Sequence, residues 1–330
     1  MKGGYALVNG KSIDGLMRHL RNQHGIAING SKQKQELLNM GYYHGYKGYR
    51  FIRKSHDKIP YSNFNEISAV YQFDVKLKTL FYPEIMLIET ALKNYTLETI
   101  VKHGPAEFEF VFSRLMNSHK RYATGNQDYR KKMKNKLELR TNINDAIAQN
   151  YSQKRDVIQH FFHKNESVPL WTIFEIISMG QFGFFLSCLD DNIRIDIAKD
   201  LKIHSTSHNQ DGGLLPQIVY LIKDLRNAVA HNGVIFDCRF NKADVPKKIT
   251  SYLQSETSIK NLNFIHIIDY FVIVIVLLKK LSKTKTELKK IIRSFQGEVE
   301  NLRPSIPVNA FTSIMGSDYK NKISLLKNYI

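Results

Sequence analysis

Apolar residues recur mainly at intervals of three and four positions from Phe64 onward, a spacing that predicts amphipathic helices. Convincing runs of strict alternation, which would indicate β-strands, are missing from the sequence. We therefore expect an all-α fold, a helical bundle with additional helices at its N- and C-terminal ends. The long helices are expected at residues 67–101 with Pro83 as a candidate break, 129–151, 169–186, 214–231 and 264–295.

Clusters of turn-forming residues divide the chain into parts. Residues 1–60 are expected to be a helical lead-in that ends in a Tyr/Gly-rich turn cluster and the short linker 59–63. Residues 61–300 are expected to form one main helical domain with a basic helical insert at about 119–151. Residues 301–330 are expected to be a C-terminal tail.

A strongly apolar run at residues 264–278 raises the question of membrane insertion. The run has fifteen residues and contains His266 and Asp269, and it is shorter than the roughly 20 apolar residues that a bilayer requires. We expect a core helix there and no membrane partner. Because the first residues lack a sustained apolar stretch, we also expect no secretory signal and a cytoplasmic location.

The charge balance indicates an acidic partner. The chain of 330 residues has 48 lysines and arginines against 30 acidic residues, a net charge of +18, and such an excess favours binding to nucleic acid or to an anionic surface. RNA is the simpler partner. Cys188 and Cys238 are the two cysteines, which is too few for a zinc ribbon or a disulfide framework and is typical of a reducing compartment.

Two segments concentrate the positive charge. Residues 119–140 hold eight lysines and arginines against two acids, interleaved with Tyr122 and Tyr129, and residues 279–293 hold seven against one. Such a mixture can follow a phosphate backbone and stack on bases, although a solvated helix face explains any single lysine equally well. The candidate RNA-binding residues are Lys120, Arg121, Arg130, Lys131, Lys132, Lys134, Lys136, Lys279, Lys280 and Lys283.

The most informative short motif is Arg226-Asn227-Ala228-Val229-Ala230-His231. It ends an amphipathic stretch that Asn232 and Gly233 would terminate, which places His231 at the carboxyl end of a helix. Cleavage of RNA through its 2′-OH needs a proton donor and acceptor near neutral pH, and histidine supplies both because its ordinary pKa is about 6.5. The planar fork of Arg226 suits a phosphate, and this pair requires no metal.

Helix geometry limits what the motif does in one chain. Five positions along a helix correspond to roughly 140° of rotation, so Arg226 and His231 point apart unless the helix ends or a second copy of the chain completes the site. A symmetric homodimer would supply that copy. His231 could instead only cap the helix, because a helix C-terminus favours the charged form of histidine. Asn227 could hydrogen-bond the phosphate or the other subunit, or it could simply be a surface residue near the end of the helix.

Glu89 is a candidate supporting residue because it lies at the edge of an apolar helical stripe, where a carboxylate needs a partner. It could orient Arg226 or a substrate 2′-OH from across the fold. Equally, it could pair with Lys93 one turn later on its own helix.

A metal site is not expected. His204 and His208 are four positions apart, but the surrounding Ser/Thr/Asn/Gly-rich stretch lacks the nearby acidic or cysteine ligands that a metal ion would also need. We expect neither a metal nor a cofactor.

The motif resembles the Arg-polar-x-x-x-His signature of HEPN-superfamily ribonucleases. Further blocks, in the right order, are similar to those of the AbiD/AbiF group of abortive-infection proteins, and the resemblance spans about residues 16–234. The blocks are NMGYYHGYKGY at 39–49, YQFDVKL at 71–77, IETALKN at 88–94 and PLWTIFEIISMG at 169–180. Two features depart from the group: Lys93 stands where an arginine is usual, and residues 232–234 replace a tail that is rich in histidine or bears an arginine.

The resemblance implies a HEPN-type, metal-independent endoribonuclease that acts as an RNA-cleaving toxin in bacterial defence against phage. Arg226, Asn227 and His231 would be the catalytic residues, cleavage would leave 2′,3′-cyclic phosphate ends, and a small non-coding RNA would control the enzyme. Two other classes of function also fit the residues. One is a non-cleaving RNA-binding protein in a stable ribonucleoprotein, and the other is an inactive helical scaffold that docks a protein through the face around 214–231.

Overall fold

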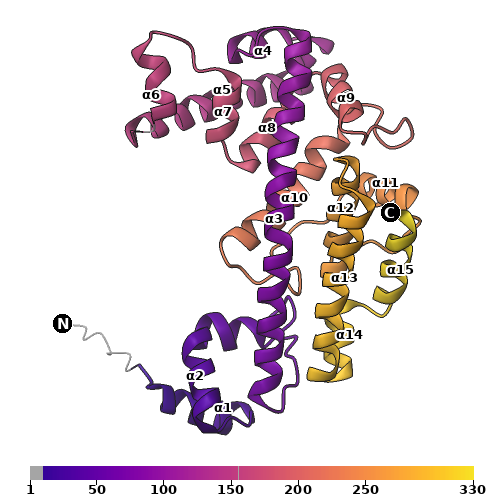
Figure 1. The fold of residues 1–330 in the computed structure, drawn as a ribbon. Coiled ribbons are helices and arrows are strands. Elements are labelled where there is room, and N and C mark those ends of the chain that lie inside the picture. Colours follow the sequence, from indigo (N-terminus) through magenta and orange to yellow (C-terminus); the bar gives the residue numbers. More distant parts are fainter. Residues whose placement is uncertain (1–9, 155) are drawn as a thin grey trace, which may run out of the picture.

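The computed structural model describes residues 10–154 and 156–330. Within these residues the protein has fifteen α-helices and no β-strand, which confirms the predicted all-α class (Figure 1). Residues 1–9, for which we predicted no secretory signal, lie outside the described residues.

The N-terminal part is a small helical group. Helices α1 (Ile13–His24) and α2 (Gly30–Met40) lead into η1 (Gly41–Lys47). The Tyr/Gly-rich cluster forms η1, which is a π-helical turn. Glycine permits it: Gly41 has a positive φ of 76°, and a Cβ on Gly45 would lie 2.7 Å from Cγ of Met40.

Helix α3 (Phe64–His103) is the central element, and it runs from the N-terminal group to the opposite end of the molecule (Figure 1). A capping box starts it, in which the Asn63 side chain accepts a hydrogen bond from the Glu66 N–H at 3.2 Å and the Glu66 side chain bonds back to the Asn63 backbone. The candidate break at Pro83 does not occur. Helices α10, α12 and α13 contact α3, and we attribute its continuity to this packing, which offsets the hydrogen bond that proline cannot donate.

The predicted helix at 129–151 is confirmed, whereas the one at 169–186 is two helices. The structure has α4 (Phe108–Arg114), η2 (Ser118–Arg121), α5 (Gln127–Ser152), α6 (Asp156–His163), α7 (Leu170–Ile176) and α8 (Met179–Cys188). The break between α7 and α8 has a local cause. Ser178 caps α8 by accepting a hydrogen bond from the Gln181 N–H at 3.2 Å, and the Gln181 side chain bonds back to Ser178.

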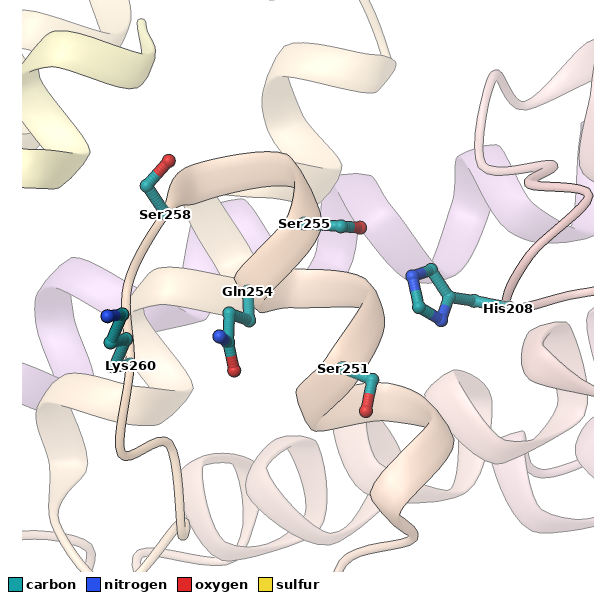
Figure 2. A pocket seen from close by; sticks show the side chains of 6 residues that line it. All are labelled: His208, Ser251, Gln254, Ser255, Ser258 and Lys260. Carbon is teal, nitrogen blue, oxygen red and sulfur yellow. The ribbon is translucent and has the colours of Figure 1, made fainter.

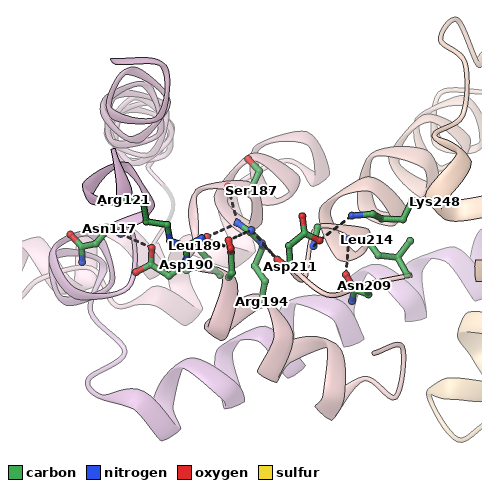
Figure 3. Close-up of polar contacts among 12 residues, drawn as sticks. Asn117, Arg121, Ser187, Leu189, Asp190, Arg194, Asn209, Asp211, Leu214 and Lys248 are labelled. Carbon is green, nitrogen blue, oxygen red and sulfur yellow. Dashed lines mark hydrogen bonds and ion pairs between the residues drawn. The ribbon is translucent and has the colours of Figure 1, made fainter. Parts of the chain in front are cut away.

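A polar network holds the loop between α9 (Asp191–Asp200) and α10 (Leu214–Ala230) (Figure 3). The buried Arg194 guanidinium donates to the carbonyl oxygens of Leu189 at 2.6 Å and Asp211 at 3.0 Å. In the same loop the Asn209 side chain accepts from the N–H of Leu214, the first residue of α10, at 2.9 Å. The start of α10 is thereby fixed, while its length packs on α8 and α3.

The C-terminal part is a helical layer beside α3 (Figure 1). It consists of α11 (Lys247–Thr257), α12 (Ile267–Lys280), α13 (Lys285–Leu302), η3 (Arg303–Ser305), α14 (Val308–Met315) and α15 (Tyr319–Tyr329). The helix predicted at 264–295 is thus two helices, because Ser282 takes a positive φ of 66° and Thr284 begins α13 with a capping box.

Helix α12 is the core helix that its apolar sequence predicts. Every residue from Ile267 to Leu278 is buried, and the buried ammonium of Lys322 on α15 pairs with Asp269 at 2.7 Å. None of the helices in residues 10–154 and 156–330 has the length and apolar content to cross a membrane.

Candidate functional site

The motif lies where α10 ends. The helix stops at Ala230, and His231 is its exposed C-cap residue. Asn232 takes the left-handed conformation with φ 53°, its N–H bonds to the Val229 carbonyl at 3.3 Å, and the Gly233 N–H bonds to the Ala228 carbonyl at 2.7 Å. These two bonds form a Schellman motif, so the predicted helix end is confirmed.

Arg226 is held from across the fold by a buried carboxylate. Its Nε donates to Oε2 of Glu89 on α3 at 2.9 Å, and the Glu89 side chain is only 11% exposed. The other carboxylate oxygen pairs with Nζ of Lys93 at 3.1 Å. The two partners that the sequence offered as alternatives for Glu89 are therefore both bound, and the guanidinium of Arg226 is fixed at a partly exposed position.

Among the described residues, the structure gives no contact between the side chains of Arg226 and His231. In the part of the chain that the structure describes, the Arg226 side chain bonds to Glu89 and, at 3.5 Å, to Oδ1 of the neighbouring Asn227. The His231 N–H still bonds to the Asn227 carbonyl at 3.0 Å, so its backbone continues the path of the helix. On an ideal helix five positions correspond to roughly 140° of rotation, so the two side chains leave α10 from different faces.

A hollow of about 520 Å³ opens beside the motif. Asn227 and Ala228 of α10 line one part of it, and Arg239 and Lys242 of the following loop line another. Arg239 is anchored by Asp237, with Nη2 to Oδ2 at 2.7 Å. The hollow therefore brings two further cations close to Asn227, together with the carboxylate of Asp224.

A second network, which the sequence analysis missed, fixes the loop after His231. The Lys78 ammonium donates to Oδ1 of Asn232 at 2.7 Å and pairs with Asp74 at 3.0 Å. The fully buried Asp74 also accepts from the backbone N–H groups of Ile235 at 2.8 Å and Phe236 at 2.7 Å. Lys78 and Asp74 lie on α3, so the same helix positions Arg226 and the loop that follows the motif.

The network continues into the π-helical turn. Nδ2 of Asn232 lies 3.3 Å from Nε2 of His44, an exposed histidine in η1. Asp74 and His44 lie within two of the sequence blocks that carry the family resemblance, and this position in the sequence could have marked them as candidates. Their pairing with the motif loop spans more than 150 positions and cannot be read from spacing.

The candidate basic residues of the first segment differ in burial and in their partners. Lys136 is buried with its ammonium 4.5 Å from the centre of the Phe112 ring, and burial lowers its pKa. Arg121 pairs with Asp191. The residues that are exposed or half-buried on η2 and α5 are Lys120, Arg121, Arg130, Lys131, Lys132 and Lys134, of which Lys134 pairs with Glu138 at 3.4 Å.

The three candidate lysines of the second segment are engaged within the chain. Lys279 lies 3.8 Å from the centre of the Tyr329 ring, Lys280 pairs with Glu256 at 2.7 Å, and Lys283 pairs with Glu84 on α3. All three are half-buried, and α12, which carries Lys279 and Lys280, lies on the other side of α3 from α5 (Figure 1). The structure thus does not bring them together with the α5 cations.

His208 lies away from the motif, in a pocket of about 540 Å³ against α11 (Figure 2). The other side chains that line this pocket are those of Ser251, Gln254, Ser255, Ser258 and Lys260, none of which is a carboxylate or a thiol. Across residues 10–154 and 156–330 no group of three or more His, Cys, Asp or Glu side chains is arranged to hold a metal ion.

Comparison with known proteins gives a family match. A family model described as Abi-like protein matches residues 35–237, which is more than half of the chain and includes α3, α10 and the motif. Comparisons with curated proteins and with solved structures find no match.

Proposed function

The chain belongs to the Abi-like protein family, and from this premise we propose that it is a metal-independent endoribonuclease of the HEPN superfamily, in the AbiD/AbiF group. The family indicates a role in abortive infection. Within that role the protein would act as an RNA-cleaving toxin in defence against phage. The observation that carries the proposal is Arg226, held by the buried Glu89 beside the exposed end of α10.

The geometry suits the phosphate of an RNA chain. Nε of Arg226 is occupied by Glu89, which leaves the outer edge of the guanidinium, beside Asn227, to grip phosphate oxygens. A guanidinium that is already fixed stabilises the charge that develops in the transition state without reorganising. Arg226 and Asn227 would therefore hold the scissile phosphate.

The exposed His231 would transfer the proton. In the reaction the 2′-oxygen attacks phosphorus, the bond from phosphorus to the 5′-oxygen breaks, and a proton passes from the 2′-OH to a base while the leaving oxygen gains one. Histidine can perform either transfer near neutral pH. The products would be a 2′,3′-cyclic phosphate and a 5′-OH.

The working unit would be a homodimer. Within one chain Arg226 and His231 point apart, so a single copy lacks a compact site. A two-fold axis beside the end of α10 would place Arg226 of one protomer near His231 of its partner, because such an interface uses the same surface on both subunits. RNA would bind the surface cations of η2 and α5, and a small non-coding RNA that occupies this surface would control the toxin.

Substitution of Arg226 by lysine tests the role of the guanidinium. Arg226→Lys keeps the charge and loses the fork, so we expect cleavage of labelled RNA to fall about 100- to 1000-fold, the usual loss when one stabilising donor is removed. RNA binding should persist. Arg303→Lys, at an exposed arginine on η3, is the matched control and should cleave normally.

Two results would overturn the proposal. Equal cleavage by Arg226→Lys and the wild type would remove the fork from the mechanism. A discrete RNA that co-purifies with the wild type, with no cleavage by any variant, would favour the non-cleaving ribonucleoprotein.

A further inference from the structure

The π-helical turn η1 presents a tyrosine to solvent. Tyr43 is 76% exposed, against 51% for both Tyr82 and Trp171. Other rings hold the ring of Tyr43 in place. The ring of Tyr42 packs edge-on against it at a centroid distance of 5.6 Å, and Tyr42 packs on the buried Tyr46 at 5.3 Å. The structure thus offers an aromatic face that is already ordered.

A lysine lies over this ring, and further cations lie in the same part of the molecule. The Lys47 ammonium lies 4.5 Å from the centre of the Tyr43 ring and 5.4 Å from that of Tyr42. The pKa of the neighbouring His24 lies below its ordinary value, first because of burial and further because of nearby cations that include Arg50 and Lys47. A surface with this charge complements a polyanion.

The turn that carries the ring contacts the loop that follows the candidate cleavage motif. His44, the next residue after Tyr43, contacts Asn232 at 3.3 Å, and Asn232 directly follows His231. Lys78 fixes Asn232 from the other side. A strand of RNA with its phosphate at the end of α10 would therefore pass close to η1, and π-helical turns are frequent at functional sites.

We propose that Tyr43 and Lys47 form a base-stacking subsite for single-stranded RNA next to the motif. The choice of RNA as ligand rests on the proposed function. An unpaired base would stack on the Tyr43 ring, and the Lys47 ammonium would contact an adjacent phosphate. Because the bases of a duplex are already stacked on one another, the subsite selects unpaired segments such as loops and single strands.

Binding to the His231→Ala variant tests the subsite, since RNA would stay intact on it. A short fluorescent single-stranded RNA and its fully paired duplex are titrated and followed by anisotropy. Stacking of one base contributes about 1–3 kcal/mol, so adding Tyr43→Ala should weaken binding of the single strand about 5- to 150-fold. Duplex binding should not change, and Tyr43→Trp should retain the affinity.

Tyr151→Ala is the matched control, because Tyr151 is also an exposed tyrosine, at 41%, but lies at the C-terminal end of α5, at the opposite end from the helix's exposed cations at residues 130–134. If Tyr43→Ala binds the single strand as tightly as its parent, or if the duplex loses affinity equally, the subsite does not exist. Normal cleavage by the wild type together with no effect of Tyr43→Ala would reject the subsite alone. A clear effect of Tyr43→Ala together with no cleavage by the wild type would reject the ribonuclease and leave an RNA-binding subsite.

Discussion

Glu89 is the residue on which the geometry of the motif depends. One buried carboxylate accepts from Arg226 through one oxygen and from Lys93 through the other. A buried charge is tolerated when its hydrogen-bonding capacity is filled, and here two cations fill it. As a result, the guanidinium of Arg226 is less mobile and is held in one direction.

Substitution of Glu89 by glutamine should therefore impair cleavage more than it impairs folding. Glu89→Gln removes a charge-assisted hydrogen bond of about 1.5–3 kcal/mol, so we expect RNA cleavage to fall roughly 10- to 150-fold. Glu84→Gln is the matched control, since Glu84 lies on the same helix, is similarly buried and pairs with Lys283 away from the motif. If Glu89→Gln and Glu84→Gln lose equal amounts of both thermal stability and cleavage activity, Glu89 has no special role in holding Arg226.

At the scale of elements, α3 is the frame of the site. Its Glu89 reaches Arg226 near the end of α10, its Lys78 reaches Asn232 and its Asp74 reaches the backbone of residues 235 and 236. The Tyr49 hydroxyl, just after η1, donates to Asp74 at 2.7 Å. One helix therefore sets the position of the motif, of the loop after it and of the N-terminal group.

Asp74→Asn should loosen that loop. The change removes the charge that faces Lys78, and the loss of one partner from a buried ion pair costs about 3–5 kcal/mol. We expect a lower free energy of unfolding in urea, together with faster hydrogen exchange at the amides of Ile235 and Phe236. Asp269→Asn breaks a second buried Asp–Lys pair, with Lys322, and serves as the control.

The two variants should differ in where protection is lost. Asp269→Asn should destabilise by a similar amount without a selective change at Ile235 and Phe236. Unchanged exchange at these amides in Asp74→Asn would mean that the loop is held by something other than the α3 carboxylate.

At the scale of the whole molecule, one copy of the chain leaves Arg226 and His231 apart. The proposed dimer predicts that two defective copies can repair each other. In a mixture of Arg226→Ala and His231→Ala chains that are refolded together, a heterodimer would contain one site with both residues intact. With equal amounts, cleavage should return to roughly a quarter of the wild-type level.

Each variant refolded alone is the control and should be inactive. If the mixture also stays inactive although the chains exchange partners, each site takes both residues from one chain, and the two-fold arrangement is wrong.

Local signals in the sequence predict the helices well and could have corrected two errors. Apolar spacing and the Asn232-Gly233 terminator predict α10 to within one residue. The splits before α8 and α13 both carry readable capping boxes, Ser178 with Gln181 and Thr284 with Glu287. The apolar spacing continues through both breaks, so spacing alone predicted a single helix in each region.

The rest of the site depends on contacts between distant segments. The burial of Lys136 against Phe112 depends on how α5 packs on α4, and the contact of His44 with Asn232 depends on the path of the chain around α3. Neither follows from residue type or spacing, because a lysine on a helix and a histidine in a turn are ordinarily solvated. Glu89 was found because a charge at the edge of an apolar stripe requires a partner within the fold.

The most direct measurement compares wild type and His231→Ala on end-labelled total RNA in the presence of EDTA, with the ends of the products identified. The account predicts cleavage by the wild type alone, with 2′,3′-cyclic phosphate and 5′-OH ends, and equal folding and RNA binding of both proteins. Equal cleavage by His231→Ala, or cleavage by the wild type that EDTA abolishes, would contradict it.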